Sequence, residues 1–431
     1  MSSFWTFFPL IFMLVLLLLK MPVAFAMLVP TALYFIFGQN MAPTEMMVQK
    51  MVTTTETFTY LAVPFFTFAG VVFNYAGITQ RLLGLADLLV GHLKGGLAHV
   101  NILLSAMMGG LSGSSLADAA MQSKILVPEM EKLGYDRGFS AAVTATSSVI
   151  TPIIPPGIIL IMYATAANVS VQKMFFGGVI PGILLTVGLM VVAAVISHKK
   201  NYKGSRTKAA TFKEVMHSLK EAIFALFVPF GLIMGLRFGM FTATEGGAIC
   251  SVYALFVGAF LYRELHWKDM LPIIKETIAS TASIMFLLAA AQALGRYLTW
   301  ESLPQQISEL LVSTFSTKWT YLLAVNILLL VIGCFFDGGA AMVLTAPLLA
   351  PAASMLGIDL IHFGIIMAIN LTIGGVTPPF GTLMFVTCQI TDTKMERFVK
   401  AVIPFLISEI VVLFLCTYVP QLVTALPNTL N

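Results

Sequence analysis

The sequence predicts an all-α polytopic membrane protein built from an inverted repeat, with two re-entrant helical hairpins and two broken helices. Three observations predict this fold: an apolar composition, a one-sided distribution of basic residues, and a second half that repeats the first. Of 431 residues, 58% are hydrophobic and 10% are charged, whereas a soluble domain has about 25% charged residues on average. Most of the surface must therefore face a lipid bilayer.

Charge-poor stretches recur along the whole chain, beginning with residues 4–19 and 23–38. A helical span needs about 20 apolar residues, whereas a barrel needs closely spaced segments of alternating polarity, which this sequence lacks. No basic residue precedes the first stretch, unlike in a signal peptide, so we expect an uncleaved first span. The four cysteines form no CxxC pair, which argues against a metal site or a disulfide framework.

The segment 198–220 carries seven Lys and Arg residues and determines the expected orientation. Basic loops stay in the cytoplasm, so this linker is expected there, and both termini are expected in the periplasm of a bacterial inner membrane. The basic residues follow the membrane topology, so no nucleic-acid partner is expected. The nucleotide-binding motif GxxxxGK[ST] is missing from the sequence, which leaves an ion gradient as the common energy source.

The second half of the chain aligns with the first at one fixed offset and without gaps. This repeat offset places Pro155-Pro156 on Pro378-Pro379, and Asp136 on Asp359. Under the expected topology the two copies run in opposite directions. Inverted repeats with matched interruptions are typical of secondary transporters with a site at the repeat interface. A gene duplication with a purely structural outcome is the alternative.

The stretch 101–127 is interrupted by the Gly/Ser-rich run GGLSGSS at 109–115. This run predicts a hairpin tip between two half-helices of about ten residues, or about 15 Å, each. Ser115 and Asp118 have the spacing of a capping box, so Asp118 is expected to cap the second half-helix rather than bind an ion.

The run TPIIPPG at 151–157 contains three prolines in five residues, which break a helix because proline lacks a backbone donor. Broken backbone at membrane depth is tolerated where it is buried or lines a cavity, although a kinked helix without a site is the alternative. The counterpart of this run lies within 370–381.

Two charged residues have more than one expected role. Asp337 precedes a helix in the second hairpin, and an intramembrane carboxyl needs either a cation or a capping role. Arg296 could pair with an anionic substrate or with Asp337, or its side chain could extend to the membrane interface. Glu245 is expected to stabilise the start of a helix.

Unwound segments offer carbonyl, hydroxyl and amide oxygens to sodium, while half-helix N-termini suit a carboxylate. Na+ is the only metal expected, with no tightly bound cofactor. The expected sodium ligands are Ser112, Gly113, Ser114, Ser115, Ser147, Ser148, Thr151, Asp337, Gly338, Asn370, Gly374 and Thr377. The expected substrate contacts are Ser115, Pro155, Pro156, Arg296, Asp337, Pro378 and Pro379.

Five segments together resemble the large membrane subunit of tripartite ATP-independent periplasmic (TRAP) transporters: residues 109–119, 151–157, 241–247, 337–339 and 374–381. The resemblance covers nearly the whole chain. It implies an elevator mechanism, a small four-helix membrane subunit, here expected as a separate chain, and a periplasmic substrate-binding protein. It also implies sodium-coupled uptake of a small organic acid, such as a C4-dicarboxylate or a sialic acid.

On this basis the chain divides into five segments. These are N-terminal scaffold helices (1–100), a first transport repeat (101–197), the basic linker (198–220), further scaffold helices (221–320) and a second transport repeat (321–419). Within the repeats we expect hairpins at 101–127 and 321–351, and broken helices at 138–167 and 361–390.

Three other functions are compatible with parts of this pattern. A stand-alone sodium/dicarboxylate symporter would use similar hairpins without a binding protein, and a channel would need no ion gradient. An intramembrane serine protease would use Ser112, Ser114 or Ser115, but the six histidines lie in loops or at span ends. No enzyme activity is therefore expected.

Overall fold

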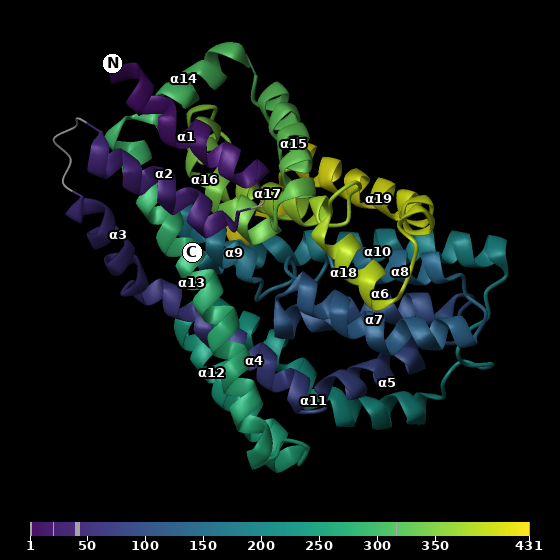
Figure 1. Cartoon of the computed structure of the whole chain (residues 1–431). Helices are drawn as coiled ribbons and strands as arrows, with labels where there is room; N and C mark the ends of the chain where they lie inside the picture. Colours follow the sequence, from purple (N-terminus) through teal and green to yellow (C-terminus); the bar gives the residue numbers. More distant parts are fainter. Residues whose placement is uncertain (1, 20, 39–43, 316, 431) are drawn as a thin grey trace.

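The computed structural model describes residues 2–19, 21–38, 44–315 and 317–430, and these residues form helices and turns without a β-strand (Figure 1). Eight helices among them are long and apolar enough to cross a membrane. Their ranges are 58–75, 171–200, 212–237, 243–261, 267–300, 318–335, 338–355 and 395–418. The structure therefore confirms the all-α membrane fold.

The helices outside the two repeats pack mainly around α13 and α4. They are α1 (Ser2–Leu18), α2 (Val23–Phe37), α3 (Glu45–Thr55), α4 (Ala62–Tyr75), α5 (Ile78–Val90), α11 (Phe212–Arg237), α12 (Ala243–Phe256), α13 (Met270–Trp300) and α14 (Leu303–Thr314). Short turns η1 (Phe58–Leu61), η2 (Val257–Leu261) and η3 (Trp267–Asp269) connect some of them. The helix α13 contacts α2, α3 and α4, and forms a long diagonal across the molecule in Figure 1.

The two repeats have matching helices. The first contains α6 (Gly96–Ser112), α7 (Ser115–Lys132), α8 (Arg137–Ser147), α9 (Ile158–Ala166) and α10 (Val171–Lys200). The second contains α15 (Lys318–Phe335), α16 (Gly338–Met355), α17 (Leu360–Gly374), α18 (Thr382–Ile390) and α19 (Met395–Tyr418), followed by α20 (Gln421–Thr424) and η4 (Pro427–Thr429). The repeat offset superimposes α7 on α16 at both ends, which confirms the repeat.

The equivalent helices also begin with equivalent caps. Ser114 caps α7 and Asp337 caps α16, while Asp136 caps α8 and Asp359 caps α17. The N-cap position expected for Asp337 is thus confirmed. In both repeats the double proline lies in the break and contains a cis peptide bond.

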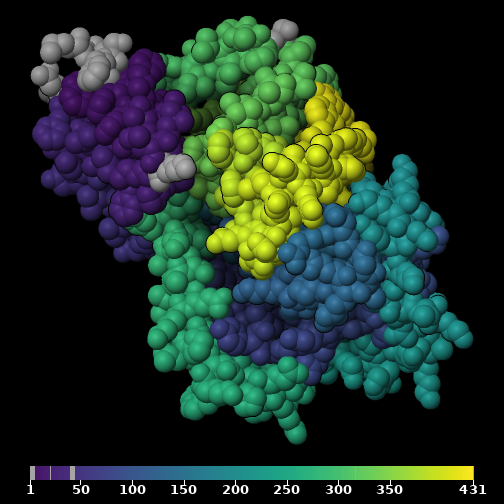
Figure 2. All heavy atoms as spheres, turned by 45° about the vertical axis from the view of Figure 1, so that its right-hand side comes forward, coloured from purple at the N-terminus to yellow at the C-terminus, as the bar shows by residue number. Residues whose placement is uncertain are grey.

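The two repeats pack directly against each other. Helix α19 contacts α8 and α10, and α18 contacts α7. Figure 2 shows the last helices, in yellow, lying against first-repeat residues, in blue. The two hairpins and the two broken helices therefore belong to one packed unit, which we call the repeat unit.

The half-helices of the first hairpin are longer than expected, with 17 residues in α6 and 18 in α7. The expectation of about ten residues was wrong because Gly109 and Gly110 remain helical. Both glycines allow close packing: a Cβ on Gly109 would lie 2.8 Å from the Cβ of Ile154, and one on Gly110 would overlap Pro229. The chain reverses at Gly113 instead, in the left-handed conformation with φ 59°, which costs glycine little.

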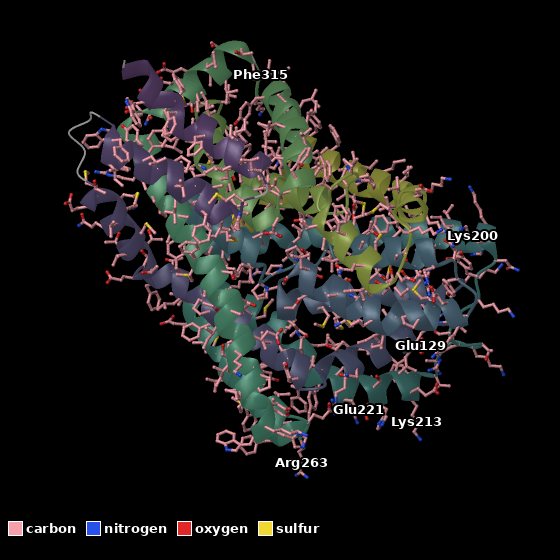
Figure 3. The ribbon with its side chains drawn as sticks, viewed as in Figure 1. Glu129, Lys200, Lys213, Glu221, Arg263 and Phe315 are labelled. Atoms are coloured by element: carbon pink, nitrogen blue, oxygen red, sulfur yellow. The ribbon has the colours of Figure 1, made fainter. Side chains whose placement is uncertain are left out.

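The non-helical part of the basic linker comprises residues 201–211, because α10 extends to Lys200 and α11 begins at Phe212. Figure 3 shows Lys200 at the right edge, Lys213 at the lower right and Arg263 at the bottom of the molecule, all away from Phe315 at the top. Met1 and Asn431 lie outside the described residues, and the orientation expected for the termini stays a prediction.

Asp118 joins the first hairpin to the first break. Its Oδ2 accepts hydrogen bonds from Ser105 Oγ at 2.7 Å and Thr151 Oγ1 at 2.9 Å, and its Oδ1 accepts one from Gln122 Nε2 at 2.8 Å. The capping box expected between Ser115 and Asp118 is wrong, because Ser114 caps α7 and Asp118 lies too far into the helix. Asp118 is 1% exposed, so these three donors supply its solvation.

An asparagine joins each hairpin to the first half of each broken helix. In the first repeat Ser147 Oγ donates to Asn101 Oδ1 at 2.7 Å. In the second repeat Asn370 Nδ2 donates to Asn326 Oδ1 at 2.9 Å. Ser147 and Asn370 are equivalent under the repeat offset, so the same connection is made twice with different side chains.

We expect Gly374→Ala to destabilise the protein, because an added Cβ would overlap the backbone of Gly333 where α17 crosses α15. Overpacking of this kind costs about 1–3 kcal/mol. The measurement is the thermal unfolding midpoint of the purified protein. The matched control is Gly295→Ala, where nothing lies within 4 Å of the added Cβ. Equal midpoints for the two variants would contradict the close crossing.

We expect Asp118→Ala to lower the unfolding midpoint, because Ser105, Gln122 and Thr151 each lose a buried acceptor. Unsatisfied buried groups cost about 1–3 kcal/mol each. The control is Glu129→Ala, which removes an exposed ion pair with Lys132 worth about 0–1 kcal/mol. If the unfolding midpoint of Asp118→Ala were no lower than that of Glu129→Ala, the Asp118 carboxyl would not stabilise the packing of the hairpin against the break.

Candidate functional site

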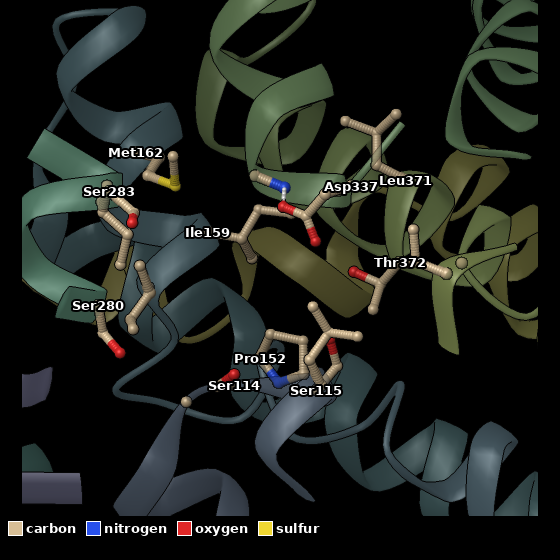
Figure 4. A pocket seen from close by; sticks show the side chains of 18 of the residues that line it. Ser114, Ser115, Pro152, Ile159, Met162, Ser280, Ser283, Asp337, Leu371 and Thr372 are labelled. Carbon is tan, nitrogen blue, oxygen red and sulfur yellow. Dashed lines mark hydrogen bonds between the residues drawn. The ribbon is translucent and has the colours of Figure 1, made fainter. Parts of the chain in front are cut away.

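A cavity of about 540 Å3 lies where the two hairpin tips, the two breaks and α13 meet (Figure 4). Its walls come from the tips at 113–116 and 337–339, from the breaks at Pro152 and Gly375, and from the α13 face at 279–287. We call it the tip pocket. It contains contributions from both repeats and from a helix outside them, as expected for a site at the repeat interface.

The tip pocket is lined by hydroxyl groups and one carboxyl. The hydroxyls belong to Ser114, Ser115, Ser280, Ser283, Thr372 and Thr382. Asp337 is the single charged side chain among the described lining residues. Its Oδ2 accepts a hydrogen bond from the backbone N–H of Gly339 at 3.0 Å, drawn as a dashed line in Figure 4.

Asp337 and the first tip face each other across this pocket. In Figure 4 Asp337 lies above the cavity, Ser114 and Ser115 lie below it, and Ser280 and Ser283 border it on the left. Asp337 is exposed, and the space to which it is exposed includes the tip pocket. Helices α7 and α16 both begin at this pocket, so each tip also contributes the free backbone N–H groups of a helix N-terminus.

The two tips differ in charge although their backbones are equivalent. The repeat offset places Ser114 on Asp337, and each caps the helix that follows it. The hydroxyl of Ser114 accepts from the backbone N–H of Ala117 at 3.4 Å. One tip is therefore neutral and the other carries a carboxyl that can attract a cation.

Only some of the expected site residues line the tip pocket. Those that do are Gly113, Ser114, Ser115, Asp337 and Gly338. The others do not line the pocket and lie within the breaks or on the helix ends beside them: Ser112, Ser147, Ser148, Thr151, Pro155, Pro156, Asn370, Gly374, Thr377, Pro378 and Pro379. We call these residues the second layer, although Pro379 is exposed.

Several hydroxyl groups of this second layer already have partners. Ser148 Oγ donates to the carbonyl of Ala145 at 2.7 Å, and Thr377 Oγ1 donates to that of Ile373 at 2.9 Å. Thr151 donates to Asp118. These hydroxyl oxygens keep lone pairs that can accept.

Two oxygen atoms of the second layer have no hydrogen-bond partner among the described residues. They are Ser112 Oγ and Asn370 Oδ1, and both are buried. Buried polar atoms are nearly always paired, so unpartnered oxygens beside a break suit a cation. One of these oxygens lies in each repeat, Ser112 Oγ in the first and Asn370 Oδ1 in the second.

Arg296 lies in a different cavity from Asp337. It lines a cavity of about 610 Å3 together with Lys50, Asn168 and Gln292, which we call the cationic pocket. Arg296 follows Ser283 on α13 by between three and four turns, which corresponds to about 20 Å of helix. Within the described chain no ion pair joins Arg296 to Asp337, so the structure does not place these two expected partners together.

Glu245 has the helix-start role expected for it. Its carboxylate accepts from the backbone N–H of Thr242 at 2.7 Å, while Thr242 Oγ1 accepts from the N–H of Glu245 at 3.3 Å. These two bonds form a capping box at the start of α12.

The sequence interpretation missed Ser280, Ser283 and Lys50. Ser280 and Ser283 are three residues apart in the apolar helix α13, so they share one helical face. Such small polar residues are frequent wherever membrane helices pack, and only tertiary structure shows that this face lines a cavity. Lys50 stands in the sequence without a neighbouring motif that would suggest a site.

The chain matches one protein family over nearly its entire length. The family model described as "Tripartite ATP-independent periplasmic transporter, DctM component" matches residues 10–422.

Several curated proteins are similar to the chain. The sialic acid TRAP transporter large permease protein SiaM of Vibrio cholerae is 36% identical over 408 residues, covering 95% of both chains. The C4-dicarboxylate TRAP transporter large permease protein DctM of Pseudomonas aeruginosa is 36% identical and covers 89% of both. The isethionate TRAP transporter permease protein DctMQ of Oleidesulfovibrio alaskensis is 35% identical, covering 91% of this chain and 61% of the longer relative.

A solved structure supports the fold. The Alcanivorax borkumensis YdaH transporter, described as having an unusual topology, matches with a TM-score of 0.62 and 15% identity over 95% of this chain and 98% of the other. The relatives are named as transport permeases, which are not enzymes. The chain belongs to the large permease (DctM component) family of tripartite ATP-independent periplasmic transporters, multi-pass proteins of the inner membrane.

Proposed function

We propose that this permease takes up a small organic acid together with sodium ions, by an elevator movement, after a periplasmic binding protein delivers the acid. One observation carries the proposal. The tip pocket, at the interface of two inverted repeats, has a carboxyl as its single charged side chain among the described lining residues. An acid can bind there only if a cation accompanies it.

The need for a cation follows from electrostatics. Two negative charges about 6 Å apart at an effective dielectric constant near 20 repel each other by about 3 kcal/mol. No Lys, Arg or His side chain is found in the described lining to offset this repulsion. Sodium held beside each break changes the sign of the interaction. The acid then binds well only when the ion is present, which is how the two fluxes become coupled.

The second layer supplies the ligands for this ion. Asn370 Oδ1 and Ser112 Oγ are unpartnered oxygens among the described residues, and the breaks leave backbone carbonyls outside regular helix. Each repeat contributes one of these two oxygens, which supports one sodium site in each repeat. The two sites use different positions, because the repeat offset places Asn370 on Ser147 and Ser112 on Phe335. Ser115, Thr377 and the other expected ligands complete the proposed sites.

The substrate class follows from the tip pocket and the names of the relatives. Those names refer to sialic acid, C4-dicarboxylate and isethionate, which share a carboxylate or sulfonate and several oxygen atoms. The hydroxyls of Ser280 and Ser283 suit such an oxygen-rich anion. We propose a small organic acid of this class, delivered by a periplasmic binding protein.

The proposed movement follows from how the helices are grouped. The repeat unit packs as one body, and α13 passes along it with Ala279, Ser280 and Ser283 towards the tip pocket. Small side chains on this face would offer little resistance to sliding. The repeat unit would then carry the tip pocket past a fixed α13.

A separate small membrane subunit is proposed as a partner. This chain covers 61% of the longer relative DctMQ, which leaves that protein room for a further membrane segment. The rival function is a stand-alone sodium/dicarboxylate carrier. The likeness to YdaH concerns the fold alone and does not distinguish the two functions.

The test is uptake into proteoliposomes that contain this permease with its small subunit. Radiolabelled N-acetylneuraminate, succinate and isethionate are each offered with and without a sodium gradient, and with and without the binding protein encoded with the permease. We expect accumulation of one acid only when gradient and binding protein are both present. Accumulation without the binding protein would support the rival carrier, and accumulation without sodium would exclude the proposed coupling.

We expect Asp337→Ser to abolish sodium-driven uptake, because serine caps a helix about as well as aspartate but carries no charge. This variant gives the second tip the residue that Ser114 provides in the first. The measurement is the initial uptake rate in the same proteoliposomes, with an expected loss of at least a hundredfold.

The control for this substitution is Asp359→Ser. Asp359 caps α17 by accepting from the N–H groups of Ile361 and His362, and it lies outside the tip pocket. Its uptake rate should stay within about twofold of the original because only a cap is exchanged. Retained uptake in Asp337→Ser would reduce Asp337 to a capping residue.

A further inference from the structure

The geometry points to a second binding site for the acid, in the cationic pocket at Lys50 and Arg296. This inference rests on the proposed function, because it assigns the site to the same anion that the tip pocket receives. We propose that the two cations hold the carboxylate or sulfonate of the acid where it enters or leaves the permease, and that they take no part in sodium binding.

The cationic pocket lies between the repeat unit and the helices outside it. Lys50 on α3 and the stretch 291–299 of α13 form one wall, together with Pro304 and Gln305 of α14. Residues 343–354 of α16 and Asn168, just after α9, form the other wall. Any acid that passes between α13 and the repeat unit at this end of the molecule must pass these groups.

The pocket continues into a polar cavity of about 600 Å3. The two cavities share Lys50, Asn168 and Gln292. The second cavity is lined by the hydroxyls of Thr53, Thr54, Thr57, Thr59, Tyr60 and Thr165. Together they form one continuous space, lined by apolar residues on the α16 side and by hydroxyls on the α3 side. Its only charged lining groups, among the described residues, are the two cations.

The cations lie near each other and lack acidic partners in the described part of the chain. Arg296 Nη2 is 3.8 Å from the sulfur of Met46, and Lys50 follows Met46 by about one turn of α3. No ion pair involving Lys50 or Arg296 is found among the residues that the structure describes, whereas Arg81 pairs with Glu264 at 2.7 Å. Two neighbouring positive charges without a carboxylate attract an anion.

The face of α13 in the pocket has the pattern of a lining rather than of a lipid contact. Gln292, Arg296 and Thr299 recur at i, i+4 and i+7, which places them on one side of the helix. A Cβ on Gly295, also in the lining, would have nothing within 4 Å. The Arg296 guanidinium lies 5.9 Å above the Trp300 ring. Its cavity also contains two side-chain amides from other elements, Asn168 and Gln305, which can donate to the remaining oxygens of an acid.

The two sites divide the binding task. Arg296 lies about 20 Å along α13 from Ser283, so one helix carries both the cationic pocket and one wall of the tip pocket. At the cationic pocket protein charges attract the acid without sodium. At the tip pocket Asp337 repels it until sodium is bound.

The test uses a thiol placed in the cationic pocket. In Gly295→Cys, the new side chain points into open space, and the four native cysteines Cys250, Cys334, Cys388 and Cys416 are buried. The protein, with its small subunit in nanodiscs, is labelled with a sulfonate-bearing or a trimethylammonium-bearing methanethiosulfonate. We expect the sulfonate reagent to lose about tenfold in relative rate when Lys50→Gln and Arg296→Gln are added, because each cation contributes Coulomb attraction at short range.

The control is Lys268→Gln in the Gly295→Cys protein, since Lys268 is exposed and lies outside the pocket. It should leave the ratio of the two labelling rates unchanged. An equal ratio with and without Lys50 and Arg296 would overturn the proposed charge of the site.

The acid itself provides the second arm of the test. N-acetylneuraminate or succinate, without sodium, should slow labelling of Gly295→Cys at least threefold, while uncharged mannitol should not. The protection should disappear in the protein with Lys50→Gln and Arg296→Gln and persist in Asp337→Ser. No protection by either acid would overturn the second site, even if uptake proved sodium-driven. Protection without sodium-driven uptake would leave the second site standing and refute the proposed function.

Discussion

The whole structure depends on one constraint, that a peptide group facing lipid must find a hydrogen-bond partner within the protein. The breaks at 148–157 and 375–381 interrupt the helices at membrane depth. Other parts of the chain must therefore shield their free backbone groups from lipid. The first hairpin does so with Gly113, which lies against the backbone of Pro156, and with the carboxyl of Asp118. The second does so with the contact between Gly333 and Gly374. Interrupted helices therefore come with tightly packed hairpins, and the cavity forms where their tips meet.

Within this duplicated frame, charge is distributed unequally. One tip has a serine and the other a carboxyl at the same position, and the two cations of the cationic pocket lie on helices outside the repeat unit. Negative charge thus belongs to the part proposed to move, and positive charge to α3 and α13. The cationic pocket therefore attracts a small acid at all times, whereas the tip pocket repels it until sodium is bound. Release from the cationic pocket and binding in the tip pocket are then controlled by different groups.

Features that depend on neighbouring residues along the chain could be predicted from the sequence. The breaks at the double prolines and the N-cap position of Asp337 follow from backbone donors and helix ends, and the repeat follows from matching residues at one fixed offset. Features decided by tertiary contacts could not. Gly109 and Gly110 stay within α6, where Ile154 and Pro229 leave no room for a larger side chain. Asp118 lies inside α7 because the helix begins one residue after the cap Ser114, and it accepts hydrogen bonds from Ser105 and Thr151 of other segments. The lining serines of α13 and the pocket around Arg296 depend on which helices pack there, which a single sequence does not specify.

The unlike pair Ser114 and Asp337 has a kinetic consequence. Two inverted repeats with identical tips, related by a two-fold axis in the membrane plane, would present the same barriers to inward and outward passage. Unlike tips allow the forward and reverse turnover numbers to differ by orders of magnitude. They leave the final concentration ratio untouched, because only the ion and solute gradients fix that equilibrium. The substitution of one residue in a duplicated chain thus affects the rate of transport in each direction, but not the concentration ratio of the solute at equilibrium.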